Sequence, residues 1–237
     1  MNTLHRLLAL PVLVLTVATT HAGTFADINV LDASDADWAA IPATVTGATG
    51  NTVAAGTLDV TEIKFANNAT DLFILVRFAE AVNPNQSAND PYTGFALYFG
   101  VDRDSSYTTG NNIFGVNQVG VEARWANDYP ISEVGGALSS QAYIGNYNQS
   151  TSFQEYRIPL NTSFVGGSLD GQSVFGSGPF TFVFYTAGNG PLGGFDDFVV
   201  STYTFAAIPE PSTYVALAGL AILGFVLHRR RAVRNPR

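Results

Sequence analysis

Two stretches decide the fold class of this chain: Asp59-Val60-Thr61-Glu62-Ile63-Lys64-Phe65 and Leu72–Phe78. They are separated by Asn67-Asn68-Ala69-Thr70-Asp71. The first stretch alternates polar and apolar residues, which is typical of a half-buried strand. The connecting residues favour a turn, because Asn and Asp side chains can hydrogen-bond to their own backbone. The second stretch is almost wholly apolar and predicts a more deeply buried strand.

Similar short runs, separated by clusters of Gly, Asn, Asp, Ser and Pro, continue on both sides of this segment. Further strands are expected at Phe25–Leu31, Trp38–Val45, Phe95–Val101, Val116–Trp125, Gln141–Tyr147, Phe153–Ile158, Phe180–Thr186 and Asp197–Phe205. No stretch of this region keeps a helical period without a break. Many short strands at near-regular spacing predict an all-β fold, an antiparallel β-sandwich of jelly-roll-like type. Leu72–Val76 and Phe95–Phe99 should be buried near its centre.

The N-terminus has the pattern of a secretion signal. Met1–Arg6 carries Arg6, Leu7–Ala18 is apolar, and Thr19-Thr20-His21-Ala22 follows with small residues. This order is that of a signal peptide, helical before its removal, and a buried amphipathic helix would show a different pattern. Residues 1–22 are therefore predicted to be removed by signal peptidase, with cleavage after Ala22 and Gly23 as the nearest alternative.

The C-terminus has the pattern of a membrane anchor. Tyr214–Leu227 is apolar and uncharged, and His228 and three arginines close it. At a rise of about 1.5 Å per residue, a helix of this length is shorter than the hydrocarbon core of a bilayer, which is roughly 30 Å thick. Extension at Ser212 and snorkelling arginines make a transmembrane helix at about 212–228 feasible. The basic end is expected in the cytoplasm, with residues before Ser212 outside the inner membrane.

Residues 23–207 form one predicted extracellular domain of ordinary size. It carries five basic and eighteen acidic side chains, a net charge of −13. Such a surface repels phosphate, so nucleic-acid binding is excluded, and it favours cations or neutral partners. The chain has no cysteine, and its histidines are His5, His21 and His228. A Ser-His-Asp triad, a histidine zinc site and a cysteine nucleophile are therefore excluded from this domain.

Ile208-Pro209-Glu210-Pro211-Ser212, the apolar helix and Arg229-Arg230-Arg231 occur in that order over residues 208–237. This arrangement resembles the PEP-CTERM sorting signal. The same C-terminal motif is also described as the C-terminal domain of ice-binding proteins, but that description does not imply that this chain binds ice. The resemblance implies that an exosortase-type membrane protease recognises Pro209, Glu210 and Pro211. It also implies a Gram-negative source, transient anchoring, and a final place on the cell surface or in the extracellular matrix of a biofilm.

The domain itself resembles DOMON-like and family 9 carbohydrate-binding sandwich domains. The resemblance rests on Asp35–Trp38 with Ile41-Pro42, Val60–Phe65, Asp71–Val76, Phe95–Asp104 and Tyr156–Leu160. It would span about Phe25 to Phe205. It implies a two-sheet sandwich that binds sugars, or a descendant that has lost this binding.

Asp102, Asp104 and Ser106 follow a predicted strand with the spacing of the first three ligands in a calcium loop. Tyr107 and Ile113 depart from the EF-hand pattern, which has glycine and glutamate at those positions. The motif predicts either weak calcium binding or an ordinary strand-end turn. No other cofactor is expected.

Trp125 and Tyr129 are the aromatic residues expected to contact a ligand. Trp125 ends a predicted strand beside Asn127 and Asp128, where a ring could stack on a sugar, whereas Trp38 is expected in the core. The alternative for Trp125 is burial as well, since buried aromatic rings outnumber ligand platforms.

Three functions remain compatible with the sequence. The leading hypothesis is a non-catalytic surface or matrix protein that contacts polysaccharide. The second is a glycan-active enzyme that uses a pair of carboxylates, of which no pair is singled out by spacing. The third is a purely structural or adhesive module, because a fold does not fix a function.

Overall fold

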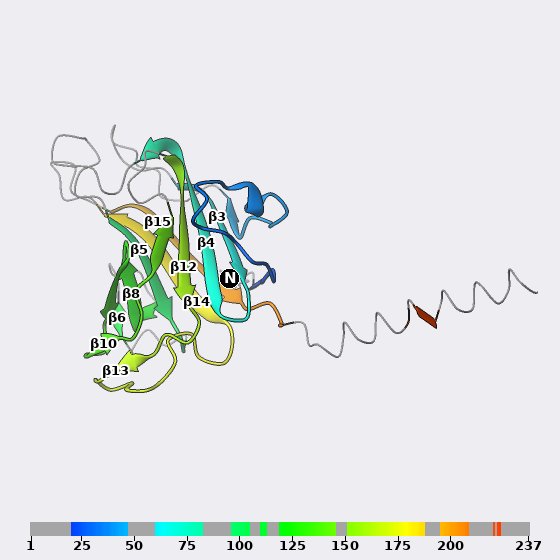
Figure 1. The fold of residues 1–237 in the computed structure, drawn as a ribbon. Helices are drawn as coiled ribbons and strands as arrows, with labels where there is room; N and C mark the ends of the chain where they lie inside the picture. The colour runs from blue at the N-terminus through cyan, green and yellow to red at the C-terminus, as the bar shows by residue number, and fades with distance from the viewer. Residues whose placement is uncertain are drawn as a thin grey trace, which may run out of the picture.

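The computed structural model describes residues 20–46, 60–82, 96–104, 110–112, 119–145, 151–187, 195–208, 220 and 222–223. Within the domain these residues form strands and a single short 3-10 helix, η1 (Ala36–Trp38). Most of the strands belong to two sheets that face each other (Figure 1). The predicted all-β sandwich is confirmed.

The larger sheet has six strands in the order β1-β15-β14-β5-β8-β9. Their bounds are β1 (Thr20–Ala22), β15 (Phe195–Thr204), β14 (Phe180–Ala187), β5 (Ala96–Asp102), β8 (Ala123–Ala126) and β9 (Tyr129–Ser132). Neighbouring strands are antiparallel except β1, which runs parallel to β15. The predicted strands near Phe95, Phe180 and Asp197 correspond to β5, β14 and β15.

The second sheet has five strands in the order β11-β12-β4-β3-β2, all antiparallel. Their bounds are β11 (Tyr143–Gly145), β12 (Thr151–Pro159), β4 (Asp71–Val82), β3 (Val60–Asn67) and β2 (Val45–Thr46). Two small ladders complete the domain: β10 (Ala137–Leu138) with β13 (Phe164–Val165), and β6 (Asn111–Asn112) with β7 (Gly120–Val121).

Aromatic rings from both sheets fill the space between them. The ring of Phe65 lies 4.5 Å from that of Phe182 and 5.0 Å from that of Tyr203. Ile74 and Val76 of β4 join the same core. Alternation along each strand therefore directs one set of side chains inward, as the period-two pattern predicted.

The N-terminal segment covers the outer face of the second sheet (Figure 1). Ile28, Val30, Trp38 and Ile41 pack there on Phe73 and Leu75 of β4. Leu72–Val76 are buried because β4 is covered on both faces, with exposed fractions of 2% or less. The burial predicted for this stretch is confirmed, as is the core position of Trp38.

The strands predicted at Phe25–Leu31 and Trp38–Val45 are wrong. In the first range only Phe25 bridges another strand, at Asn67. In the second, η1 ends at Trp38 and pairing begins only at Val45. The apolar residues of this segment are buried because they pack on β4. Their spacing therefore indicated burial against the sheet, and the segment does not pair as a strand.

The predicted terminal segments lie mostly outside the described residues. Of the signal peptide only Thr20–Ala22 is described, as β1, and the N–H of Gly23 donates to Thr204 O at 2.7 Å. Of the predicted transmembrane helix, Leu220, Ile222 and Leu223 are helical and exposed. No helix within the described part of the chain is long and apolar enough to cross a membrane.

Candidate functional site

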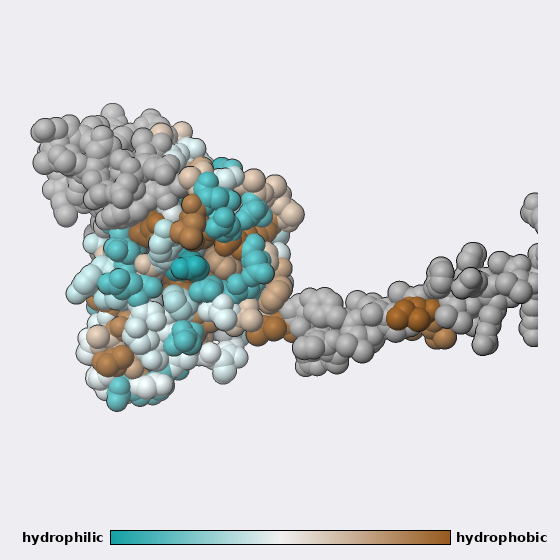
Figure 2. Space-filling view, viewed as in Figure 1, coloured by the Kyte–Doolittle hydropathy of each residue, from teal (hydrophilic) through white to brown (hydrophobic). Residues whose placement is uncertain are grey.

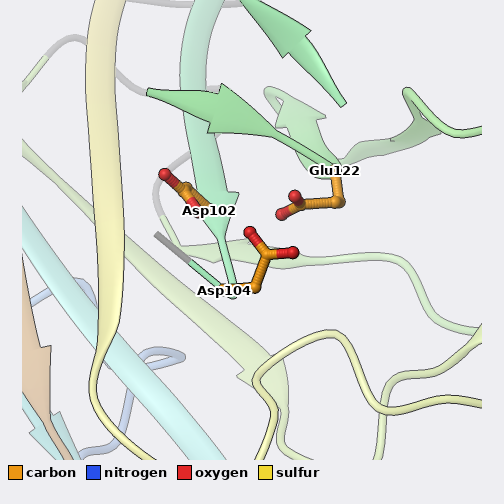
Figure 3. A group of neighbouring side chains, drawn as sticks. All are labelled: Asp102, Asp104 and Glu122. Carbon is orange, nitrogen blue, oxygen red and sulfur yellow. The ribbon is translucent and has the colours of Figure 1, made fainter. Parts of the chain in front are cut away.

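Three carboxylates meet at one end of the larger sheet. Asp102 is the last residue of β5, Asp104 follows it, and Glu122 stands between β7 and β8. Val101 pairs with Ala123, and the N–H of Glu122 donates to Val101 O at 3.1 Å, so Glu122 lies beside Asp102. One carboxylate oxygen from each residue lies within 4.8 Å of the others. We call Asp102, Asp104 and Glu122 the carboxylate cluster (Figure 3).

The carboxylate cluster is mostly buried. Asp102 and Glu122 are fully buried, whereas Asp104 is exposed. Oε2 of Glu122 accepts a 2.9 Å hydrogen bond from the Arg103 N–H. Burial raises the pKa of Glu122 to about 7, and the negative charges of Asp102 and Asp104 act in the same direction. The site therefore disfavours three bare negative charges and suits a bound proton or cation.

The structure brings together two of the three predicted calcium ligands. Asp102 and Asp104 belong to the carboxylate cluster, and Ser106 lies outside the described residues. Sequence reasoning missed Glu122. The signal available in the sequence was a single acidic residue, Glu122, in the otherwise apolar run from Val119 to Ala123. Glu122 also separates β7 from β8, so the strand predicted at Val116–Trp125 is divided at this residue.

Trp125 is a core residue, and the hypothesis of an exposed sugar platform at this position is wrong. Its exposed fraction is 0%, and its ring stacks between Phe99 and Phe175 at centroid distances of 6.0 and 6.1 Å. Its indole N–H donates to Ser140 O at 3.4 Å. The register of β8 on β5 directs this ring inward, which the polar residues after the strand could not reveal.

Tyr129 is exposed, as a ligand contact requires, with an exposed fraction of 64%. A second exposed tyrosine, Tyr143, comes from the edge strand β11 of the other sheet and was missed by sequence reasoning. The residues just before the two strands are in contact, because the N–H of Ala142 donates to Asp128 O at 3.3 Å. The guanidinium of Arg157 lies 5.2 Å from the centroid of the Tyr143 ring. We call Tyr129, Tyr143 and Arg157 the tyrosine face.

A second buried glutamate lies under the N-terminal segment. Burial raises the pKa of Glu155 to about 7, although the hydrogen bond from Trp38 opposes the shift. Glu122 and Glu155 both have raised pKa values and exposed fractions of 0%. A polymer chain cannot reach a fully buried carboxyl group, so neither side chain is placed as the general acid of a glycosidase.

Comparison with solved structures gave matches to carbohydrate-binding modules. A family 9 carbohydrate-binding module from Caldicellulosiruptor kristjanssonii, in complex with glucose, is 10% identical with a TM-score of 0.45, and 81% of this chain and 98% of that chain are covered. The same kind of module in complex with cellotriose is 10% identical with a TM-score of 0.44, covering 81% and 96%. A search of curated proteins gave no match.

Residues 207–231 match the PEP-CTERM protein-sorting motif. The match includes Pro209, Glu210, Pro211 and Arg229–Arg231, the residues on which the sorting resemblance was based. Such a motif implies export, membrane anchoring by the C-terminal segment, and processing by an exosortase. The chain therefore carries a PEP-CTERM protein-sorting motif, which lies C-terminal to an all-β domain.

Proposed function

We propose that this chain is an exported surface or matrix protein that contacts polysaccharide without cleaving it. The sorting motif at residues 207–231 carries the surface part of the proposal. We also propose that signal peptidase removes residues 1–22, that the chain comes from a Gram-negative cell, and that its destination is the extracellular matrix of a biofilm. Removal of residues 1–22 would take away β1 and leave Gly23 as the first residue, beside Thr204 of β15.

The tyrosine face supports the polysaccharide part. Tyrosine combines a flat apolar ring with a hydroxyl group, which suits the faces and hydroxyl groups of sugar rings. Tyr129 and Tyr143 are exposed, and the residues just before them, Asp128 and Ala142, are joined by a hydrogen bond. The observation that carries the proposal is this pair of exposed rings, on edge strands of the two sheets whose preceding residues are hydrogen-bonded to each other.

The charge and surface of the domain support a neutral, hydrated partner. A net charge of −13 between residues 23 and 207 disfavours anionic polymers at long range. Figure 2 shows hydrophilic and neutral residues over most of the domain face in view, with apolar residues in small separate patches. A broad docking surface for another protein would be visible on that face as one large continuous apolar patch.

Affinity electrophoresis of the full chain, purified in detergent, tests the proposal. Gels containing neutral polysaccharides (cellulose derivatives, xylan or mixed-linkage glucan) should retard the chain, and alginate should not. Tyr129→Ala with Tyr143→Ala should weaken retardation by about tenfold or more, since truncating an aromatic hot spot costs on the order of 2 kcal/mol. Leu31→Ala is the matched control, because Leu31 is 62% exposed and belongs to the N-terminal segment.

The same samples separate the two remaining hypotheses. Release of reducing sugar during incubation with the retarding polysaccharide would establish a glycan-active enzyme and overturn the non-catalytic role. Absence of both retardation and release over the whole panel would favour a purely structural or adhesive module.

A further inference from the structure

We propose that Asp102, Asp104 and Glu122 bind a divalent cation, with calcium preferred. The bound ion would link the end of β5 to the junction between β7 and β8. The proposal is independent of polysaccharide binding. It replaces Ser106 of the sequence motif by Glu122, which comes from a different strand and lies beside Asp102 only in the folded domain.

The ligand set is the first argument for a cation. Each of the three residues places a carboxylate oxygen within 4.8 Å of the other two, so one ion can contact all three. Two of these side chains are fully buried. Buried carboxylates repel one another strongly unless a proton, a basic group or a metal ion stands between them.

The orientation of Glu122 is the second and independent argument. Its exposed fraction is 0%, and Oε1 accepts no hydrogen bond from the residues that the structure describes. Oε2 accepts a 2.9 Å hydrogen bond from the Arg103 N–H, which restrains the position of this oxygen. Figure 3 shows the carboxyl group of Glu122 directed toward Asp104, with Asp102 beside them. A buried carboxyl group that has one oxygen without a hydrogen bond and is directed toward a neighbouring carboxyl group has the placement of a metal ligand.

The nearby arginines are engaged with other residues. Nη1 of Arg103 donates to Gln172 Oε1 at 2.7 Å. Arg124 forms an ion pair with Glu133 and lies 5.3 Å from the Tyr98 ring centroid. These contacts hold Nη1 of Arg103 at Gln172 and Nε of Arg124 at Glu133.

Calcium fits this set better than other common ions. All three donors are carboxylate oxygens, and the domain contains no histidine or cysteine to favour zinc or copper. Magnesium requires near-ideal octahedral geometry, whereas calcium tolerates irregular sets of six to eight oxygens. Asp104 is exposed, so water can complete the coordination from the solvent side. We expect a Kd on the order of 10⁻⁴–10⁻³ M, as in extracellular modules.

The test is thermal unfolding of the full chain in detergent, after treatment with chelator, with calcium chloride or magnesium chloride added. Calcium at ten times Kd should raise Tm by about 3–6 °C, and magnesium at the same concentration by less. Asp104→Asn should reduce the calcium-dependent rise at least several-fold. Because Asp104 is exposed, this variant is expected to fold even where Glu122→Gln does not.

Asp128→Asn, at an exposed acidic residue outside the carboxylate cluster, is the matched control and should keep the full calcium-dependent rise. Isothermal titration should give one calcium per chain for wild type and the control. An equal rise in wild type and Asp104→Asn, or no rise in wild type up to about 20 mM calcium, twenty times the upper end of the expected Kd, would overturn the proposal.

Discussion

The indole N–H of Trp38 donates a 2.8 Å hydrogen bond to Oε1 of Glu155, 117 positions further along the chain. Both side chains are fully buried, Trp38 in the segment that covers the second sheet and Glu155 on β12. The contact therefore fixes the N-terminal cover to the sheet beneath it. It also places a carboxyl group in a setting that disfavours its charge.

Glu155 should make the stability of the domain depend on pH. Burial raises its pKa from 4.5 to about 7, so the folded chain keeps a proton that the unfolded chain releases between these values. The free energy of unfolding should fall as the pH rises through this window, by about 3 kcal/mol. Glu155→Gln should show a shallower slope and be more stable than wild type at pH 8. Urea unfolding at several pH values in chelator measures both, and identical slopes would contradict the assignment.

Trp38→Phe should destabilise the domain more at pH 8 than at pH 5. The substitution keeps an aromatic ring but removes the donor to Glu155, which leaves a buried oxygen unsatisfied at a cost of about 1–3 kcal/mol. The cost is larger when the carboxylate is charged. The matched control is Trp38→Phe in the Glu155→Gln background, where the extra loss at pH 8 should disappear. An unchanged loss in that background would assign the effect to ring size alone.

The central strands could be predicted from sequence because their signal is local. Alternation in Asp59–Phe65 and the apolar run Leu72–Phe78 reflect burial of neighbouring side chains on β3 and β4. The same logic failed at Phe25–Leu31 and Trp38–Val45. Apolar spacing reports burial but not the backbone partner, and these residues are buried under a covering segment.

The candidate sites depend on strand pairing, which local patterns do not specify. Trp125 points inward and Glu122 lies beside Asp102 because β8 pairs with β5 in one register. A shift by one residue would reverse which side chains face the core. Asp102 and Asp104 were found because two acidic residues at a strand end are a local feature. Tyr143 was missed because the contact that links it to Tyr129, between Ala142 and Asp128, joins segments of two different sheets and leaves no local pattern.

Phe65→Ala should be among the most destabilising single substitutions in the domain. The Phe65 ring contacts Phe182, Tyr203 and Phe99 across the two sheets, at centroid distances of 4.5, 5.0 and 6.0 Å. Removing a ring from such a core costs on the order of 3–5 kcal/mol. Phe73→Ala should cost a similar amount, but by detaching the N-terminal cover. Val200→Ala is the control, since Val200 is 39% exposed, and a loss equal to that of Phe65→Ala would contradict the assigned core.

Pro209→Ala with Glu210→Ala should leave the chain in the inner membrane. Both residues lie within the sorting motif at residues 207–231, and the two prolines are expected from the sequence to favour an extended segment around Glu210. Membrane fractionation with an epitope tag placed after Arg237 should show loss of the tag from wild-type surface protein and its retention in the variant. Asn235→Ala lies outside the matched residues and should be processed like wild type. Recovery of an intact tag on wild-type protein at the cell surface would show that sorting proceeds without cleavage at this end of the chain.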